Sequence, residues 1–391
     1  MTWRASCPMD ERTAFIREMI LGERTVSDLC RIFGISRKTG HKWWNRYCTE
    51  GASGLQERSR AVHHHPNGVD TGLASALLSL RERHPDWGPQ TLLYRMQLQE
   101  PGRALPHVST VAALLRRHGL VKPRRRRARS VPYGAPFTVA SAPNELWSAD
   151  YKGQFRMRDQ RYCYPLTISD SYSRYLLCCE GLAGPTLAHT KPYFERAFRQ
   201  YGLPGAIRTD NGAPFASIAL GGVSALSLWW IKLGIVPERI RPAHPEQNGR
   251  HERMHGTLKL ACPVQTDLQA QRRALHRFQR EYNQERPHHS LGGHTPQMHY
   301  RASLRSYPRR LPELVYPQGF EVRTAHHNGE ISWRGKRWYV AQVVAHEPIG
   351  LYPIADGVWR VHIGMLAVGV LDVRNKRIEP IDTFIHVPTR H

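Results

Sequence analysis

The sequence is short of acidic residues. Its 391 residues include 32 Asp and Glu against 56 Lys and Arg, which gives a net charge of +24 at pH 7. Such an excess needs a polyanionic partner, and nucleic acid is the leading candidate. A basic membrane-surface protein is the alternative, but the arginines are not gathered on one long amphipathic helix with a broad apolar face.

Paired cysteine motifs and targeting signals are also lacking. The seven cysteines form no C-x-x-C pair, and their odd number favours a reduced chain. Residues 1–10 contain no apolar segment of the kind found in a signal peptide. The longest uncharged run, residues 213–231, contains Pro214, two glycines and three serines, so we expect a buried helix there. We therefore expect a cytoplasmic, nucleoid-associated protein with no membrane partner.

The first segment with a clear pattern lies within residues 8–60. Val26, Leu29, Cys30 and Phe33 fall on one stripe of a helix, Gly34 can make the turn, and Ser36 can cap a second helix that runs to about residue 47. An earlier helix around residues 14–20 completes a helix-turn-helix domain. The second helix carries the candidate DNA-binding residues Arg37, Lys38, His41, Lys42 and Arg46. A small helical bundle with a solvated basic face is the alternative.

A second helix-turn-helix domain is predicted over residues 70–121. Leucines 73, 77 and 80 line one helix, Pro89 starts another, and Ser109 is the expected cap of a third that Gly119 stops. A basic linker, residues 122–142, follows, with the candidate DNA-binding residues Arg124, Arg125, Arg126 and Arg127. Like charges repel, so we expect an extended arm on DNA phosphates. About six such contacts make affinity fall on the order of a thousandfold between low and physiological salt.

Two aspartates mark the next region. Asp150 lies in an expected strand, residues 146–155, that is otherwise rich in aromatic residues, and a buried acid there needs a reason. Asp210 ends a short strand and opens into a loop, which is the usual place for a functional acid in an α/β sheet. Asp170 lies at the expected turn of an antiparallel hairpin, so we interpret it as a turn former rather than a ligand.

Three stretches of the sequence, "RTDNG", "HPEQNGRHERMHGTLK" and the tail "YNQERPHHSLGGHTP", resemble motifs of a known family. Residues 143–301 resemble the catalytic core of bacterial insertion-sequence transposases and retroviral integrases. The resemblance implies an α/β, ribonuclease-H-like fold with a catalytic, metal-binding triad. In this sequence the triad is Asp150, Asp210 and Glu252.

The third triad position has two candidates. Glu246 follows Asp210 with 35 residues between them, a gap familiar in the family, whereas Glu252 leaves 41. In the family the glutamate lies on the helix after a Pro-x-x-x-Gly turn, and Pro245 and Gly249 give that position to Glu252. Residues 217–227 can hold the six extra residues, because loops accept length at small entropic cost. We therefore favour Glu252.

Three carboxylates brought together repel one another, so they imply cations. Oxygen ligands suit Mg²⁺, with Mn²⁺ as an alternative, and two such ions can clamp a phosphodiester. The resemblance implies that water cuts at the element ends and that the freed 3′-OH attacks target DNA. Asn248, Arg253 and Lys259 would then contact DNA. No His-His-Cys-Cys spacing is present, so we do not expect zinc.

Alternating apolar and polar residues over residues 313–385 predict a small C-terminal β-barrel. Arg334, Lys336, Arg337 and Trp338 belong either to a DNA-binding surface or to a purely structural barrel. The complete expectation is a multidomain DDE transposase that acts on double-stranded terminal inverted repeats and target DNA, as a dimer or larger homo-oligomer. The alternatives are a catalytically inactive, end-binding DNA-binding regulator and a plain nuclease.

Overall fold

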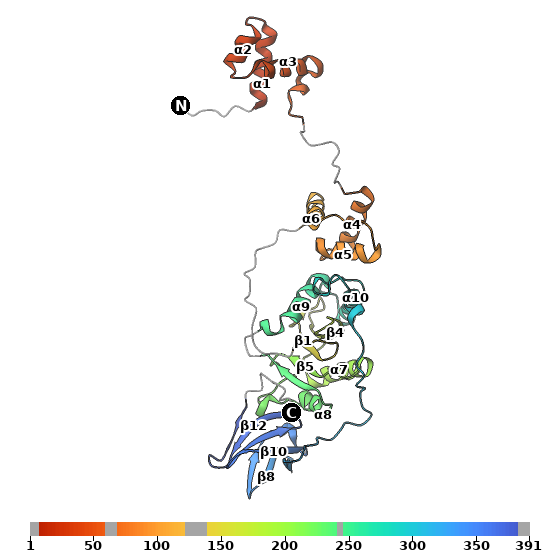
Figure 1. The fold of residues 1–391 in the computed structure, drawn as a ribbon, viewed down its shortest axis with the longest axis vertical. Coiled ribbons are helices and arrows are strands. Elements are labelled where there is room, and N and C mark those ends of the chain that lie inside the picture. The colour runs from red at the N-terminus through yellow and green to blue at the C-terminus, as the bar shows by residue number, and fades with distance from the viewer. Residues whose placement is uncertain (1–7, 59–68, 122–138, 241–244, 382–391) are drawn as a thin grey trace. The chain divides into compact units, whose positions relative to one another are not determined.

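The structure is a computed structural model that describes residues 8–58, 69–121, 139–240 and 245–381. The chain divides into two compact units, one up to Gly68 and the other from Val69 onward, and each is described by itself. Figure 1 traces both. Among the described residues, none of the helices combines the length and the apolar character that crossing a bilayer requires.

The first unit is a three-helix module that agrees with the predicted helix-turn-helix. Its helices are α1 (Pro8–Leu21), α2 (Val26–Ile32) and α3 (Arg37–Glu50), followed by the short η1 (Gly51–Leu55). Ser36 caps α3 by accepting the Thr39 backbone N–H, as expected, and Gly34 makes the turn at φ +64°. Trp43 on α3 is buried against Phe15 of α1 and Leu29 of α2.

The second unit begins with three more helices, α4 (Thr71–Arg83), α5 (Pro89–Gln99) and α6 (Val108–Arg117). Leu73, Leu77 and Leu80 are buried in their common core, as the leucine spacing predicts. The predicted cap of the third helix is wrong by two residues. His107, not Ser109, is the N-cap, because its ring accepts the Ser109 backbone N–H.

The centre of the second unit is a mixed sheet. Its strands are β1 (Leu146–Tyr151), β2 (Phe155–Arg156), β3 (Tyr162–Asp170), β4 (Leu176–Leu182), β5 (Ala206–Thr209) and β6 (Val236–Arg239). β1 pairs antiparallel with β3 and parallel with β5, β5 pairs parallel with β6, and β4 pairs with β3. The expected hairpin is therefore β3–β4. Asp170 closes its turn by accepting hydrogen bonds from Ser173 and Asn144, which agrees with a turn former.

Helices cover both faces of this sheet. They are α7 (Leu187–Tyr201), α8 (Ala225–Lys232), α9 (Gly249–Ala261) and α10 (Leu268–Gln284), with the short η3 (Pro245–Asn248), η4 (His289–Leu291) and α11 (Pro296–His299). The neighbouring residues Cys178 and Cys179 of β4 point to opposite faces. Cys178 packs in the core with α7 and α8, and Cys179 packs with α9 and α10.

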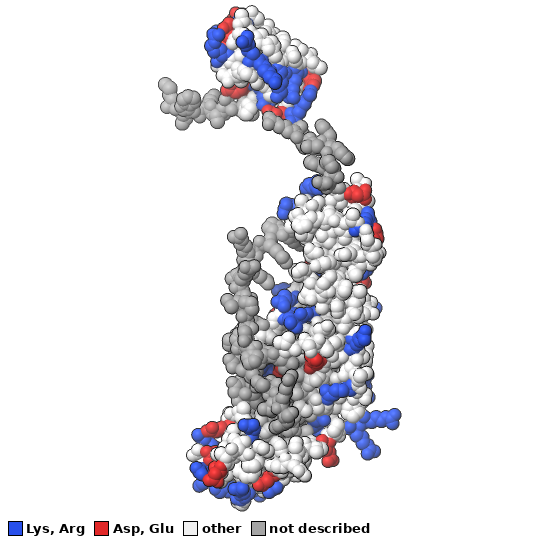
Figure 2. Space-filling model, in the orientation of Figure 1, with Lys and Arg blue, Asp and Glu red and all other residues white. Residues whose placement is uncertain are grey.

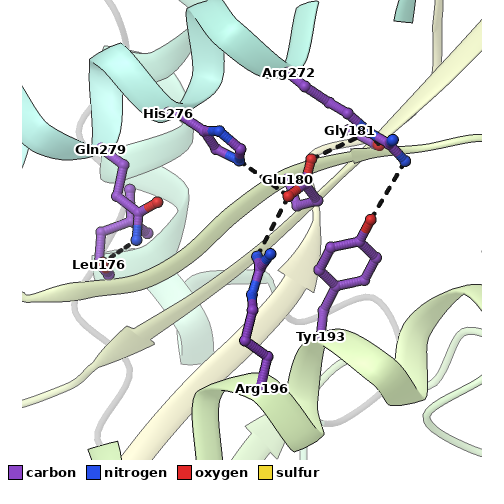
Figure 3. Close-up of polar contacts among 8 residues, drawn as sticks. All are labelled: Leu176, Glu180, Gly181, Tyr193, Arg196, Arg272, His276 and Gln279. Carbon is purple, nitrogen blue, oxygen red and sulfur yellow. Dashed lines mark hydrogen bonds and ion pairs between the residues drawn. The ribbon is translucent and has the colours of Figure 1, made fainter. Parts of the chain in front are cut away.

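A buried glutamate ties β4 to the helices on either side. Glu180 is 2 % exposed, and its carboxylate pairs with Arg196 of α7 and with Arg272 and His276 of α10. Figure 3 shows these three side chains converging on it. Arg272 also donates to the Gly181 carbonyl. The negative charge is thus neutralised by the protein's own cations.

The uncharged run over residues 213–231 is only partly helical. Ala213–Pro214 is a cis peptide, and the short η2 (Leu220–Gly222) precedes α8. The expectation of one buried helix over the whole run is therefore wrong, because Pro214 and the two glycines disfavour a helix in its first half. α8 itself is buried, as expected.

The C-terminal region forms a five-stranded antiparallel sheet and a separate hairpin. The sheet has the order β13 (Arg377–Pro380), β12 (Leu366–Asp372), β11 (Val358–Ile363), β10 (Pro348–Ala355) and β7 (Glu321–Thr324). The hairpin joins β8 (Glu330–Trp333) to β9 (Lys336–Tyr339), and the short η5 (Gln342–Val344) follows it. Among the described residues β7 and β13 do not pair, so closure into the predicted barrel is not confirmed.

This C-terminal region shares a hydrophobic core with α8. Val223, Leu228 and Ile231 pack with buried residues of the C-terminal strands. Lys232 donates to Glu347 at 2.7 Å across the same contact. Residues 217–227, which we expected to hold the six extra residues between Asp210 and Glu252, therefore lie against the C-terminal sheet.

A candidate metal centre and nucleic-acid interface

The parallel pairing of β1 and β5 brings Asp150 and Asp210 to one edge of the sheet. The register pairs Leu146 with Ala206 and Ser148 with Arg208, a constant offset of 60 residues. Continued by two residues, the same offset makes Asp150 level with Asp210. Asp150 points to the face covered by α9, because Ala149 beside it packs in the core on the α7 and α8 side.

The third carboxylate comes from α9. Ligand atoms of Asp150, Glu252 and His255 all lie within 4.8 Å of one another. Glu252 is in the first turn of α9, where an acidic side chain is favoured by the helix dipole, and it is exposed. Asp210 is not a member of this close group.

The pKa values describe how the carboxylates affect one another. Burial, together with the charges of Asp210 and Glu252, raises the pKa of Asp150 to about 8. Burial also raises the pKa of Asp210, although a hydrogen bond from the Gly212 backbone N–H lowers it in part. These are the directions expected of acids that share a site without a cation to neutralise them.

Two buried histidines connect α9 to β3. His251 and His255 both contact the Thr167 hydroxyl through Nε2, at 2.7 Å and 2.8 Å. His251 Nδ1 contacts the Ser169 hydroxyl at 3.0 Å, and Thr167 donates to the Asp150 carbonyl at 3.1 Å. Burial, with a contribution from the charge of Lys152, lowers the pKa of His255 to about 4. These hydrogen bonds between the two histidines and β3 fix the position of α9, the helix that carries Glu252.

Sequence reasoning missed two residues at this site. His255 was not singled out, because nothing in its spacing distinguishes it from the other histidines of the segment. Lys152 was not considered, although it follows Asp150 by two positions. Burial and the charge of Lys259 lower the pKa of Lys152, so the two lysines lie on the same side of the cluster. The side chain of Glu246, the rival of Glu252, lies outside the described residues.

Most of the candidate DNA-binding residues of α3 are accessible. Arg37, Lys38, His41 and Lys42 are exposed, and Figure 2 shows Lys and Arg side chains over the surface of this module. Arg46 is half-buried, with its guanidinium 5.1 Å from the Trp43 ring centroid, so part of it is committed to packing.

The other candidates divide into three groups. Arg253 and Lys259 are exposed on α9, one and seven residues after Glu252. Asn248 is only 5 % exposed at the start of α9, so it is the weakest candidate for a DNA contact. Arg124, Arg125, Arg126 and Arg127 lie outside the described residues.

In the C-terminal hairpin, Arg334, Lys336 and Arg337 are exposed, but Trp338 is 6 % exposed and packs against Trp333. For Trp338 this burial favours the structural alternative over a DNA contact. A buried tryptophan beside three exposed cations fits a hairpin whose inner face is structural.

The residues present fit a divalent metal ion. Carboxylate oxygens are the ligands that Mg²⁺ and Mn²⁺ prefer, and an imidazole nitrogen is compatible with Mn²⁺ and with later transition metals. Strand-end acids on neighbouring parallel strands, with a third acid on a helix across one face, define a ribonuclease-H-like core with a metal-dependent site.

Family models agree with this description. An "Integrase core domain" model matches residues 140–245, and a second model of the same description matches residues 233–296. A "Helix-turn-helix domain" model matches residues 11–61, and a "Homeodomain-like domain" model matches residues 39–115. Residues 320–379 match the "IS481 family transposase, C-terminal domain". The chain therefore has an integrase core, which implies a divalent metal ion, and DNA-binding helix-turn-helix domains.

The relatives belong to insertion elements. The chain is 28 % identical over 243 residues to the insertion element IS407 uncharacterized 31.7 kDa protein of Burkholderia multivorans, a match that covers 60 % of this chain and 83 % of that protein. It is 27 % identical over 230 residues to the insertion element IS476 uncharacterized 39.2 kDa protein of Xanthomonas euvesicatoria. This match covers 58 % of this chain and 64 % of that protein. The resemblance to bacterial insertion-sequence transposases is thereby confirmed.

Solved structures of viral integrases are also similar. The HTLV-2 integrase catalytic core domain in complex with magnesium is 20 % identical and covers 41 % of this chain and 100 % of its own, with a TM-score of 0.33. A chain of the simian T-cell lymphotropic virus intasome is 17 % identical, with a TM-score of 0.36. This match covers 80 % of this chain and 100 % of that one. Both scores are low, so the fold assignment rests on the sheet topology and the family models.

Proposed function

We propose that this chain is a DDE transposase that binds the terminal inverted repeats of an insertion sequence, cleaves the element ends and joins the 3′-OH to target DNA. The observation that carries this proposal is the approach of Glu252 to Asp150 within 4.8 Å, in a chain whose integrase core is preceded by helix-turn-helix domains. In this proposal, helix-turn-helix domains occupy residues 8–60 and 70–121. The basic linker is 122–142, the catalytic core 143–301 and the C-terminal domain 313–385.

Asp150, Asp210 and Glu252 are proposed to hold two Mg²⁺ ions, or Mn²⁺, that bring a phosphodiester and an attacking hydroxyl together. The raised pKa of Asp150 supports this role, because a neighbouring cation removes the cost of ionising it. No side chain then has to act as a nucleophile. Lys259 and Arg253 extend from the same helix, where their charges suit DNA phosphates.

DNA recognition is assigned to other parts of the chain. The exposed basic residues of α3 suit the major groove of a repeat, and the arginines of the linker suit phosphates along it. Joining two element ends requires both to be held at once, so we propose at least a dimer on DNA. Gel filtration with and without end DNA measures this directly.

The test is strand joining by the purified chain on labelled DNA that carries the element ends, with Mg²⁺. The wild type is expected to give cleaved and joined products, and Glu252→Gln to lose both. Glu246→Gln is the matched control, because it makes the same chemical change six residues earlier and is expected to keep both products.

Loss of products in Glu246→Gln with retention in Glu252→Gln would assign the triad to the other glutamate. A wild type that binds the ends but gives no metal-dependent product would support the alternative, an inactive DNA-binding regulator. Cuts without joining would support a nuclease.

A further inference from the structure

The hydrogen bonds around Thr167 fix the protons of both buried histidines. Thr167 Oγ1 carries one proton, and it is donated to the Asp150 carbonyl oxygen, which can only accept. Both imidazoles in contact with Oγ1 must therefore donate to it. The hydrogen-bond pattern thus assigns the Nε2–H tautomer to both His251 and His255.

The two histidines then differ at Nδ1. In His251 that nitrogen accepts the hydroxyl proton of Ser169, at 3.0 Å, so its lone pair is used. In His255 the Nδ1 lone pair faces Asp150 Oδ2 at 3.9 Å, with no hydrogen bond to any described residue. The Nδ1 lone pair is therefore unused within the described part of the fold, and His255, which is only 6 % exposed, is held in that orientation by its contact with Thr167.

We propose that His255 Nδ1 is a metal ligand, which makes the ion at Asp150 and Glu252 one with mixed nitrogen and oxygen ligands. This rests on the proposed function, and it adds a ligand outside the acidic triad. Ligands that are about 2.1 Å from one ion lie at most about 4.2 Å apart, and the 3.9 Å separation from Asp150 falls within that limit.

The surroundings of His255 match those of a metal-bound imidazole. Such a histidine donates its other ring N–H to a fixed acceptor, which sets the tautomer and the ring orientation. Thr167 Oγ1 is that acceptor, and it is bonded in turn to the backbone of Asp150, a second ligand of the same ion. One hydroxyl thus aligns two ligands.

An imidazole ligand changes the metal preference. Nitrogen donors favour Mn²⁺ and later transition metals relative to Mg²⁺, whose ligands are almost always oxygens. The wild type should therefore bind Mn²⁺ more tightly than Mg²⁺, and a His255→Asp variant, with oxygen ligands alone, should shift the preference toward Mg²⁺.

Pulsed electron paramagnetic resonance of Mn²⁺ added to the full chain tests the ligand directly. The wild-type spectrum should contain a ¹⁴N coupling from a coordinated imidazole. His255→Gln should lose that coupling and bind Mn²⁺ about 10- to 100-fold more weakly, a loss of the size seen when metal sites are perturbed. His251→Gln is the matched control, because it removes a neighbouring buried histidine whose Nδ1 is already bonded, and it should keep the coupling.

Bound Mn²⁺ without a ¹⁴N coupling in the wild type overturns the inference, whatever the variants do. So does a coupling that survives in folded His255→Gln, with folding checked by circular dichroism. A wild type that joins DNA strands but has no ¹⁴N coupling contradicts this inference and leaves the proposed function standing. A ¹⁴N coupling in a chain that joins no DNA supports the ligand and contradicts the transposase.

Discussion

Glu180 and Asp150 are both carboxylates held in the central sheet, but their surroundings are opposite. Glu180 on β4 is paired with two arginines, Arg196 and Arg272, and with the imidazole of His276. Asp150 on β1 has Asp210 and Glu252 as charged neighbours, and both raise its pKa. The first charge is neutralised within the fold. The second is surrounded by groups that destabilise its ionised form.

The difference separates an acid whose charge is balanced within the fold from one that we propose as a metal ligand. Burying a charge is costly unless it is paired, and Glu180 is paired at the edge strand where α7 and α10 meet. Asp150 incurs the same cost, and its neighbours add to it. Such an arrangement persists in a folded protein when a ligand supplies the missing positive charge. The same carboxylate-to-amide substitution should therefore have opposite consequences at the two positions.

Activity should show the largest contrast. Asp150→Asn is expected to lower the rate of Mg²⁺-dependent strand joining by roughly a thousandfold, about 4 kcal/mol of transition-state stabilisation, because it removes a metal ligand. Glu180→Gln should stay within a few-fold of the wild type once its folded fraction is matched. Product yield on labelled end DNA measures both, and equal yields from the two variants would remove the distinction.

Stability should show the reverse contrast. Glu180→Gln is expected to lower the free energy of unfolding by about 2 kcal/mol, since it removes the anion that two arginines and an imidazole surround. The cost is less than for a fully buried pair, because Arg196, Arg272 and His276 are 38–55 % exposed and regain water. Urea unfolding measures it. A variant as stable as the wild type would mean that the cluster contributes nothing.

Metal-free protein should lose stability as pH rises from about 4 to about 8. The pKa of Asp150 is raised from 3.8 to about 8, so between these values the folded state holds a proton that the unfolded state has released. We expect a loss on the order of a few kcal/mol, the linkage of one proton over this range, that Asp150→Asn abolishes and Mn²⁺ reverses. Thermal melts at pH 5 and pH 8 give the comparison, and a loss of equal size in Asp150→Asn would assign it to other groups.

A third carboxylate is intermediate between Glu180 and Asp150 in how far its charge is balanced by neighbouring groups. Glu347 has one partner, Lys232 of α8, at 2.7 Å, and both side chains are about one-fifth exposed. A double-mutant cycle with Lys232→Ala and Glu347→Ala should give a coupling of about 0.5–1 kcal/mol. No coupling would show that the shared hydrophobic core alone joins α8 to the C-terminal sheet.

Local patterns predicted where the three triad candidates lie. The aromatic-rich strand around Asp150, the strand end before Asp210 and the helix after Gly249 are features of short stretches, and the structure has each of them. The family motif was needed to choose Glu252, because spacing alone favoured Glu246. That choice stays a prediction.

Contacts between distant residues were not predictable. Glu180 looks like any acid in a strand until α10, nearly a hundred residues later, brings His276 to it. His255 is one more histidine in a histidine-rich segment until Thr167, 88 residues earlier, fixes its proton. The docking of residues 217–227 on the C-terminal sheet depends in the same way on packing that no local window contains.

The most direct test of the account is a Mn²⁺ titration followed by electron paramagnetic resonance on three proteins: the wild type, Asp150→Asn and Glu180→Gln. We predict that the wild type and Glu180→Gln bind Mn²⁺ equally, whereas Asp150→Asn loses the site. Equal binding by Asp150→Asn would contradict the claim that the carboxylates around Asp150 form the metal centre of this chain.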